Sequence, residues 1–146
     1  MSQTLEAFQL LMPIGDGATA RVWRAVHRRS KVPVALKVLS AGSALEQRLL
    51  DAEIQAMARL EHPHLLKILE HGVSRSEEQG IPAGARWMAI EHASGGTLER
   101  WQPQSWPEAR TRALEMLQGL AHAHSRGMLH RDLKPANLLM CTAHDQ

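Results

Sequence analysis

The chain has 146 residues, of which 44% are hydrophobic and 22% are charged, and its 17 lysines and arginines nearly balance its 15 aspartates and glutamates. This composition is typical of a folded globular chain and excludes a mainly disordered one. The basic residues are scattered among acidic ones, so we expect no nucleic-acid partner. No apolar run approaches the roughly 18 residues of a spanning helix, so we expect no membrane segment. The single cysteine, Cys141, cannot form an intrachain disulfide, which fits a cytoplasmic location.

The first part of the chain is predicted to form three strands. Two apolar-rich runs, residues 8–14 and 21–26, flank the glycine-bearing segment "GDGATA", and a third run follows at residues 32–39. Pro33 lacks the N–H that a strand ladder uses, so we expect it near a strand start or an edge.

A long helix is predicted to follow, because the pattern changes at Ser43. Ser43 stands three residues before Glu46, which is a capping-box spacing, and no Gly or Pro occurs before Pro63. One apolar stripe of this helix is expected to face the core. Its members are Leu45, Leu49, Ala52, Ala56 and Leu60.

Two more strands are predicted at residues 65–73 and 86–92, with a polar surface loop between them. The glycine-containing segment after the second strand, residues 93–97, reads as a connector between two lobes. We therefore expect one domain over residues 8–92 and another over residues 93–146.

The last long element is predicted to be a helix. Ser105 and Glu108 repeat the capping-box spacing, Pro107 is tolerated in a first turn, and Gly127 is a natural helix terminator. A stripe of this helix is expected to need cover from further helices: Ala113, Met116, Leu117 and Leu120. Strands come first and helices later, so the expected fold class is α+β.

Three motifs carry the functional argument, and the first is the glycine segment. Gly15 and Gly17 leave room for backbone N–H groups to approach phosphate oxygens, although a glycine-rich hairpin turn is an alternative explanation. A strand-like run follows these glycines, whereas a dinucleotide-binding motif requires a helix there. A Walker A loop is excluded because no Gly-Lys-Ser or Gly-Lys-Thr follows.

The second motif is a cation within an apolar strand. Lys37 in "VALKV" needs an anionic partner if its side chain is buried, and Glu53 of the following helix is a candidate. The alternatives are an outward-facing lysine and a solvated glutamate.

The third motif is "HRDLKPANLL", residues 130–139. It combines an acid at Asp132, a cation at Lys134 and an amide at Asn137 between apolar flanks, and chance assembly of this string is improbable. The three motifs, in this order, resemble those of the first half of a eukaryotic-type Ser/Thr protein kinase domain, over residues 8–146. The resemblance implies a kinase-like N-lobe of antiparallel sheet plus one long helix, a hinge, and the first helix and catalytic loop of an incomplete C-lobe.

The resemblance also implies the chemistry: ATP as phosphoryl donor, Mg²⁺ as cofactor, and a Ser or Thr hydroxyl of a protein substrate as acceptor. Lys37 would hold the α- and β-phosphates and pair with Glu53. Asp132 would accept the proton of the substrate hydroxyl, Lys134 would contact the transferring group, and Asn137 would bind magnesium. The residues implied in nucleotide binding are Ile14, Gly15, Gly17, Val22, Ala35, Lys37, Ile90, Glu91, Ala93 and Leu139.

In the family, an Asp-Phe-Gly motif and further helices follow the catalytic loop, and this sequence ends before them. From this we expect the chain to be inactive alone, with residues 137–140 as an unpaired strand edge and with self-association through an exposed C-lobe surface. The alternative function is that of a non-catalytic nucleotide-binding or partner-binding module.

Overall fold

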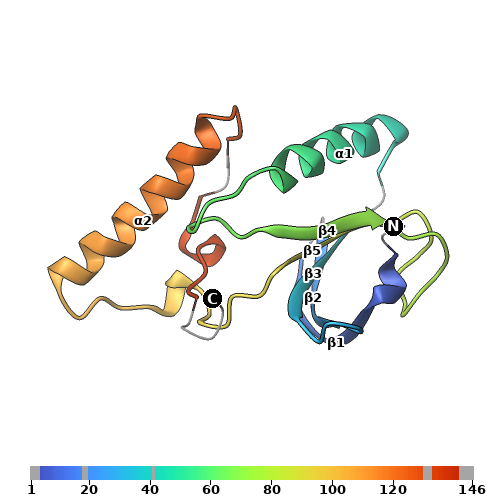
Figure 1. The fold of residues 1–146 in the computed structure, drawn as a ribbon, viewed down its shortest axis with the longest axis horizontal. Helices are drawn as coiled ribbons and strands as arrows, with labels where there is room; N and C mark the ends of the chain where they lie inside the picture. Colours follow the sequence, from blue (N-terminus) through green and yellow to red (C-terminus); the bar gives the residue numbers. More distant parts are fainter. Residues whose placement is uncertain (1–3, 18–19, 41, 130–132, 142–146) are drawn as a thin grey trace. The chain divides into compact units, whose positions relative to one another are not determined.

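The computed structural model describes residues 4–17, 20–40, 42–129 and 133–141 of the chain. The chain forms two compact units, one from residues 1–59 and 67–92 and the other from residues 60–66 and 93–146. The first unit contains a sheet and a long helix, and the second contains a long helix and short turns (Figure 1). The α+β class predicted from the sequence is confirmed.

Five strands form one antiparallel sheet in the order β1-β2-β3-β5-β4. The strands are β1 (Phe8–Asp16), β2 (Ala20–His27), β3 (Pro33–Leu39), β4 (Ile68–Val73) and β5 (Arg86–Glu91). All five were predicted, with ends that differ by up to three residues. Pro33 is the first residue of β3, as expected for a residue without an N–H.

The two faces of the sheet differ because side chains alternate along each strand. On β3, Val34, Leu36 and Val38 are buried on one face, while Ala35, Lys37 and Leu39 are half-buried on the other. The first face closes over the main hydrophobic core. Its buried members are Leu5, Phe8, Ala25, Val34, Leu36, Val38, Ile81, Ala85, Trp87 and Ala89.

The connection between β4 and β5 was predicted to be a surface loop, and this is wrong for part of it. Ile81 is only 3% exposed and belongs to the main core. The side-chain amide of Gln79 accepts a hydrogen bond from the Leu10 N–H at 3.0 Å and donates one to the Phe8 carbonyl at 3.1 Å. Since β1 is an edge strand, the loop thereby covers backbone groups of an exposed sheet edge.

The first long helix, α1 (Ala44–Ala58), begins as predicted and ends earlier than predicted. Ser43 Oγ accepts from the Glu46 N–H, and the Glu46 carboxylate accepts from the Ser43 N–H at 2.6 Å, so the capping box is confirmed. Figure 1 shows α1 next to β4, the strand that the helix contacts.

The predicted apolar stripe of α1 is wrong. Leu45 and Leu49 are 67% and 64% exposed, and Ala52 is exposed as well. The stripe that packs against Ile68 and Met88 of the sheet is displaced around the helix axis and consists of Leu50, Ile54, Met57 and Ala58. The helix carries two apolar stripes, and the one that holds the branched Ile54 and the long Met57 fills the space over the strands.

The second unit contains α2 (Trp106–His124) and the short 3-10 turns η2 (Leu98–Arg100) and η3 (Pro135–Asn137). Ser105 Oγ accepts from the Glu108 N–H, but the Glu108 carboxylate accepts from Gln104, so only half of the predicted capping box is present. The helix ends at His124 with Ser125 as its C-cap, and Gly127, the predicted terminator, follows two residues later with a φ of 76°, which suits a residue without a Cβ.

The apolar stripe expected on α2 is largely uncovered among the described residues. Leu117 is 54% exposed, Ala113 is exposed, and Met116 and Leu120 are partly buried. The buried position of α2 is Gly119, where a Cβ would lie 2.7 Å from the His64 carbonyl oxygen. Segment 60–66 therefore packs closely on this helix.

The strand edge at residues 137–140 was predicted to be unpaired, and this is wrong. Leu139 forms an antiparallel bridge with Thr97, and the Leu98 N–H donates to the Leu138 carbonyl at 2.8 Å. A Cβ on Gly95 would collide with the carbonyl of Met140. The glycine in the connector thus permits this close backbone pairing.

Candidate functional site

The predicted site residues of the first unit lie mostly on the sheet face opposite the main core. One row of paired residues crosses all five strands: Gly15, Val22, Lys37, Met88 and His71. Ala35 is two residues before Lys37 on β3, so both side chains lie on the same face of the sheet. Ala35 pairs with Ile90 of β5. The fold therefore brings Val22, Ala35, Lys37 and Ile90 together.

Lys37 occupies an apolar environment. It is half-buried, and its neighbours across the ladder are Val22 on one side and Met88 on the other. Lys37 lies on the sheet face opposite the main core, as in the outward-facing alternative considered from the sequence, and it is half-buried there. An ammonium group interacts more strongly with an anion beside apolar side chains than in open water, because less water screens it.

The two glycines, Gly15 and Gly17, lie at the end of β1 and directly after it. Gly15 pairs with Val22 within the ladder, and the Gly17 N–H donates to the Ala20 carbonyl at 2.9 Å. Ile14, beside these glycines, is 49% exposed. The hairpin considered from the sequence is present, and the role of its N–H groups toward phosphate stays a prediction.

Lys37 and Glu53 do not form an ion pair in the part of the chain that the structure describes. Glu53 is exposed on α1. Their pairing stays a prediction.

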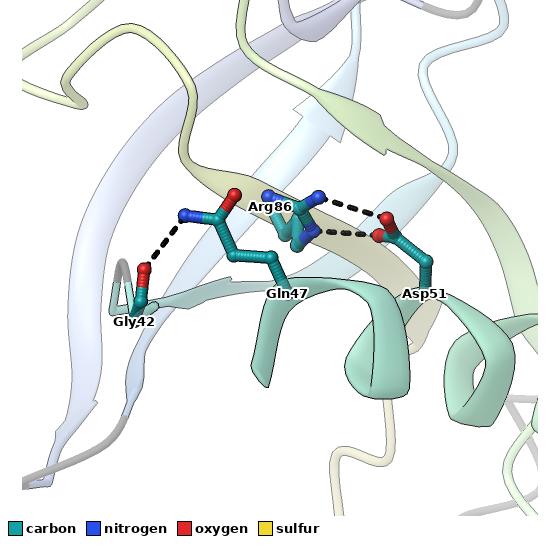
Figure 2. Close-up of polar contacts among 4 residues, drawn as sticks. All are labelled: Gly42, Gln47, Asp51 and Arg86. Carbon is teal, nitrogen blue, oxygen red and sulfur yellow. Dashed lines mark hydrogen bonds and ion pairs between the residues drawn. The ribbon is translucent and has the colours of Figure 1, made fainter. Parts of the chain in front are cut away.

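The acid that α1 directs to the sheet is Asp51. Its two carboxylate oxygens accept from Nε and Nη2 of Arg86 on β5, at 2.6 and 2.8 Å (Figure 2). These hydrogen bonds lower the pKa of Asp51 below its ordinary value, and partial burial opposes them only in part. They also raise the pKa of Arg86. Sequence reasoning missed this pair, because nothing in the spacing of residues 51 and 86 brings them together.

Glu91, the last residue of β5, forms two hydrogen bonds with Lys67, which directly precedes β4. The Glu91 N–H donates to the Lys67 carbonyl at 3.0 Å, and the Glu91 carboxylate accepts from the Lys67 N–H at 2.8 Å. These bonds fix the backbone at Glu91, a predicted adenine contact. Ala93, the next predicted contact, is partly buried at the start of the second unit's main segment.

The predicted catalytic segment is described in part. Asp132 lies outside the described residues. Lys134 precedes η3, the Asn137 N–H donates to the Lys134 carbonyl at 2.9 Å, and both side chains are exposed. Leu139 is 43% exposed.

The described residues contain no group of three or more His, Cys, Asp or Glu side chains that could hold a metal ion. Asn137 fits the predicted magnesium role by its chemistry, because a side-chain amide oxygen is a hard donor of the kind that Mg²⁺ accepts.

A histidine cluster in the second unit was not predicted. The ring centroid of His62 lies 5.5 Å from that of His64 and 5.0 Å from that of His122. Desolvation, the positive charge of Arg126 and the neighbouring His62 lower the pKa of His122. The two-residue spacing of His122 and His124 gave no signal of this cluster, since the partners of His122 come from segment 60–66.

The first unit is a five-stranded antiparallel sheet with one packed helix, a half-buried lysine on β3 and a glycine hairpin, followed along the chain by a helical unit. That arrangement is the N-lobe of the protein kinase fold, followed along the chain by elements of its C-lobe. A family model for the protein kinase domain matches residues 8–146, and the chain belongs to the protein kinase family.

Curated relatives agree with this assignment. The chain is 29% identical over 141 residues to cyclin-dependent kinase F-4 of Oryza sativa subsp. japonica, covering 93% of this chain and 29% of that protein. It is 31% identical over 139 residues to calcium/calmodulin-dependent protein kinase type IV of Mus musculus, covering 92% of this chain and 28% of that protein. It is also 31% identical over 140 residues to serine/threonine-protein kinase 10 of Xenopus tropicalis, covering 92% of this chain and 14% of that protein. The chain thus spans less than a third of the length of these curated relatives.

Among the residues that the structure describes, none of the helices has the length and apolar character needed to cross a membrane.

Proposed function

We propose that the chain contributes to ATP-dependent phosphoryl transfer onto a Ser or Thr hydroxyl of a protein substrate. The observation that carries the proposal is the family match over residues 8–146, with Lys37 half-buried beside Val22 and Ala35 on one sheet face. We assign nucleotide binding to a domain of residues 8–92. Residues 93–146 would supply the hinge and the catalytic loop.

Within this proposal, the apolar side chains around Lys37 receive the adenine ring. Val22, Ala35 and Ile90 share one face of the sheet, and Leu139 would contribute from the second unit. Ile14 and the backbone of Glu91 and Ala93 would complete the adenine contacts. Low local polarity around Lys37 strengthens its attraction to the phosphates.

We assign contacts with the phosphates of ATP to the glycine hairpin and to the predicted catalytic loop, residues 130–139. N–H groups near Gly15 and Gly17 would contact phosphate oxygens, as backbone donors do in anion-binding turns. Asp132 would accept the proton of the attacking hydroxyl, and Lys134 would contact the transferring group. Asn137 would hold Mg²⁺, which, when bound with ATP, neutralises charge on the phosphates.

A second candidate is a nucleotide-binding module without catalysis. The absence of a Lys37–Glu53 ion pair among the described residues favours it, since that pairing accompanies transfer in the family. Both candidates require Lys37, and only the first requires Asp132.

The test separates the two candidates. Calorimetry with MgATP should show binding that Lys37→Met weakens by about tenfold or more, because an ion-paired phosphate contact is lost. The chain alone is expected to transfer no label from radiolabelled ATP to a mixture of Ser- and Thr-containing peptides, and label transfer that Asp132→Asn abolishes would overturn this expected inactivity and support the first candidate. Binding that Lys37→Met leaves unchanged would refute both candidates. MgATP binding without label transfer that depends on Asp132 would be consistent with the second candidate, the nucleotide-binding module.

A further inference from the structure

The turn between β2 and β3 carries a concentration of positive charge. The stretch from residue 17 to residue 45 contains no aspartate or glutamate, although charges of both signs are mixed over the chain as a whole. Arg28, Arg29 and Lys31 lie in this turn, and all three residues are exposed. Cations that no acid nearby in the sequence balances attract an anionic group such as phosphate.

The backbone of this turn is held in one shape. The Arg28 N–H donates to the Ala7 carbonyl at 2.7 Å, and Arg28 Nε donates to the Glu6 carbonyl at 2.9 Å. The Lys31 N–H donates to the His27 carbonyl at 2.8 Å. Lys31 has a φ of 61°, in the region that favours glycine, so the turn keeps a cation at a strained position. The cations of the turn are therefore carried by an ordered backbone.

The exposed Ser30 lies among these cations, and its hydroxyl contacts a histidine. Ser30 Oγ lies 3.0 Å from His27 Nδ1, and the Ser30 N–H donates to the same nitrogen at 3.1 Å. A ring nitrogen that accepts from an N–H carries no proton, so the proton of the neutral His27 ring is on Nε2. The hydroxyl is therefore a second donor to Nδ1.

The other ring nitrogen of His27 faces an acid. Nε2 lies 3.9 Å from Glu70 Oε1, and the two side chains are 23% and 30% exposed. His27 is on β2 and Glu70 is on β4, two strands that β3 and β5 separate in the sheet. A neutral ring interacts weakly with a carboxylate at this distance, whereas a ring with a proton on each nitrogen forms a full ion pair with it.

We propose that Ser30 is a phosphorylation site, and that His27 and the cations of the turn receive the phosphate. A separate protein kinase supplies the transfer. The bond from the γ-phosphorus of ATP to its bridging oxygen breaks, and a bond from this phosphorus to Ser30 Oγ forms. ADP leaves, and the hydroxyl proton goes to the base of the donor enzyme.

The phosphate changes the charge between β2 and β4. On Ser30 it lies beside Nδ1 of His27, and an anion there favours the ring that carries a proton on each nitrogen. The charged ring then pairs with Glu70, so the modification links two strands that are not neighbours and stabilises the first unit. This inference goes beyond the function proposed above and does not depend on it, since the donor enzyme is separate and Lys37 takes no part.

The first experiment tests Ser30 as the acceptor. The full 146-residue chain is incubated with radiolabelled ATP and a Ser/Thr protein kinase that selects serines preceded by arginines. Ser30→Ala should remove most of the label. The matched control is Ser76→Ala in the β4–β5 loop, because Ser76 is also exposed and also follows an arginine, but two acids come after it. Ser76→Ala should keep the label. An unlabelled chain, or equal labelling of wild type and Ser30→Ala, would overturn the proposal.

The second experiment tests the link to β4. Phosphorylation should raise the thermal midpoint of the wild-type chain by about 2 °C or more, because an ion pair is gained. In the Glu70→Gln chain the rise should be smaller, since the charged ring has lost its partner on β4. Equal rises in the two chains, or no rise in wild type, would contradict the proposal.

NMR of the histidine rings gives a readout that a general gain in stability would not move. At neutral pH, phosphorylation should shift the His27 ring signals to the position of a ring with two protons, and His27→Gln identifies these signals. His71, on the opposite face of β4 from Glu70, should keep its signals. A phosphorylated chain in which the His27 signals stay in place would show that the ring does not receive the phosphate, and the proposal would fail.

Discussion

The two units of the chain hold their shape by different means. Each hydrophobic residue that the structure describes as buried belongs to the first unit, where Trp87, Leu36 and Ala89 are fully inaccessible. In the described part of the second unit, Gly119 is the buried residue, and order comes from helix caps and backbone hydrogen bonds. Burial of apolar surface is the larger of these two stabilising effects. We therefore expect the first unit to have a larger free energy of unfolding than the second.

The largest expected effect is at Trp87. Replacing a fully buried Trp by Ala removes its contacts and leaves a cavity, at a cost of about 3–5 kcal/mol. That is comparable to the whole stability of a small domain. In urea unfolding followed by circular dichroism, Trp87→Ala should lose most of the strand signal without denaturant. The matched change in the second unit, Leu117→Ala on the exposed face of α2, should alter stability by no more than about 0.5 kcal/mol.

Gly119 gives the next largest effect, and it tests the second unit. A Cβ there would lie 2.7 Å from the His64 carbonyl, and a backbone atom cannot move aside easily. Gly119→Ala should therefore destabilise the contact of α2 with segment 60–66 by about 1–3 kcal/mol, although Ala favours helix over Gly. Hydrogen exchange of α2 amides should become faster. Gln118→Ala, at the exposed preceding position, is the control, and equal exchange rates in the two variants would contradict the packing argument.

The stability of the first unit is expected to depend on pH in the acid range through the ion pair of Asp51 and Arg86. Because Arg86 lowers the pKa of Asp51 from its ordinary 3.8, the stabilisation by this pair is complete above that value. It is lost as the pH falls through the lowered pKa. Between about pH 5 and pH 2, the urea midpoint of the wild-type chain should fall more steeply than that of Asp51→Asn. Parallel curves would show that the pair contributes no stability.

The smallest expected effect is at His122 in the second unit. Its lowered pKa means that the unfolded chain binds the proton first, so stability is full above the ordinary value of 6.5 and decreases as the pH falls through it. Thermal unfolding between about pH 7.5 and pH 5.5 should be less pH-dependent in His122→Gln than in wild type. His124→Gln, two residues along on the exposed surface, should keep the wild-type slope.

Strands and caps were predictable from the sequence because their signals are local. Alternating apolar residues fixed the position of β3 with Lys37 opposite the core, and the spacing of Ser43 and Glu46 located the start of α1. Gly127 likewise marked the turn that follows α2, three residues after its last helical residue.

The face of α1 was not predictable in this way. Two apolar stripes compete on this helix, and only the strands beneath it determine that Ile54 is buried while Leu49 is exposed. The Asp51–Arg86 pair and the bridge of Leu139 to Thr97 join residues far apart in sequence. No periodicity reports such contacts. Lys37 is half-buried on the sheet face opposite the main core, a position between the two alternatives that the sequence left open.

The Gln79 amide on the edge of β1 limits how the β4–β5 loop can vary in length. Loops on a protein surface ordinarily accept insertions and deletions. Here the amide meets both Phe8 and Leu10, and Ile81, two residues later, is packed in the core. Removing one residue from this loop would carry the amide away from the β1 backbone and leave an open strand edge. A short deletion that preserves every strand would then leave the edge of β1 able to pair with the edge strand of another copy of the chain.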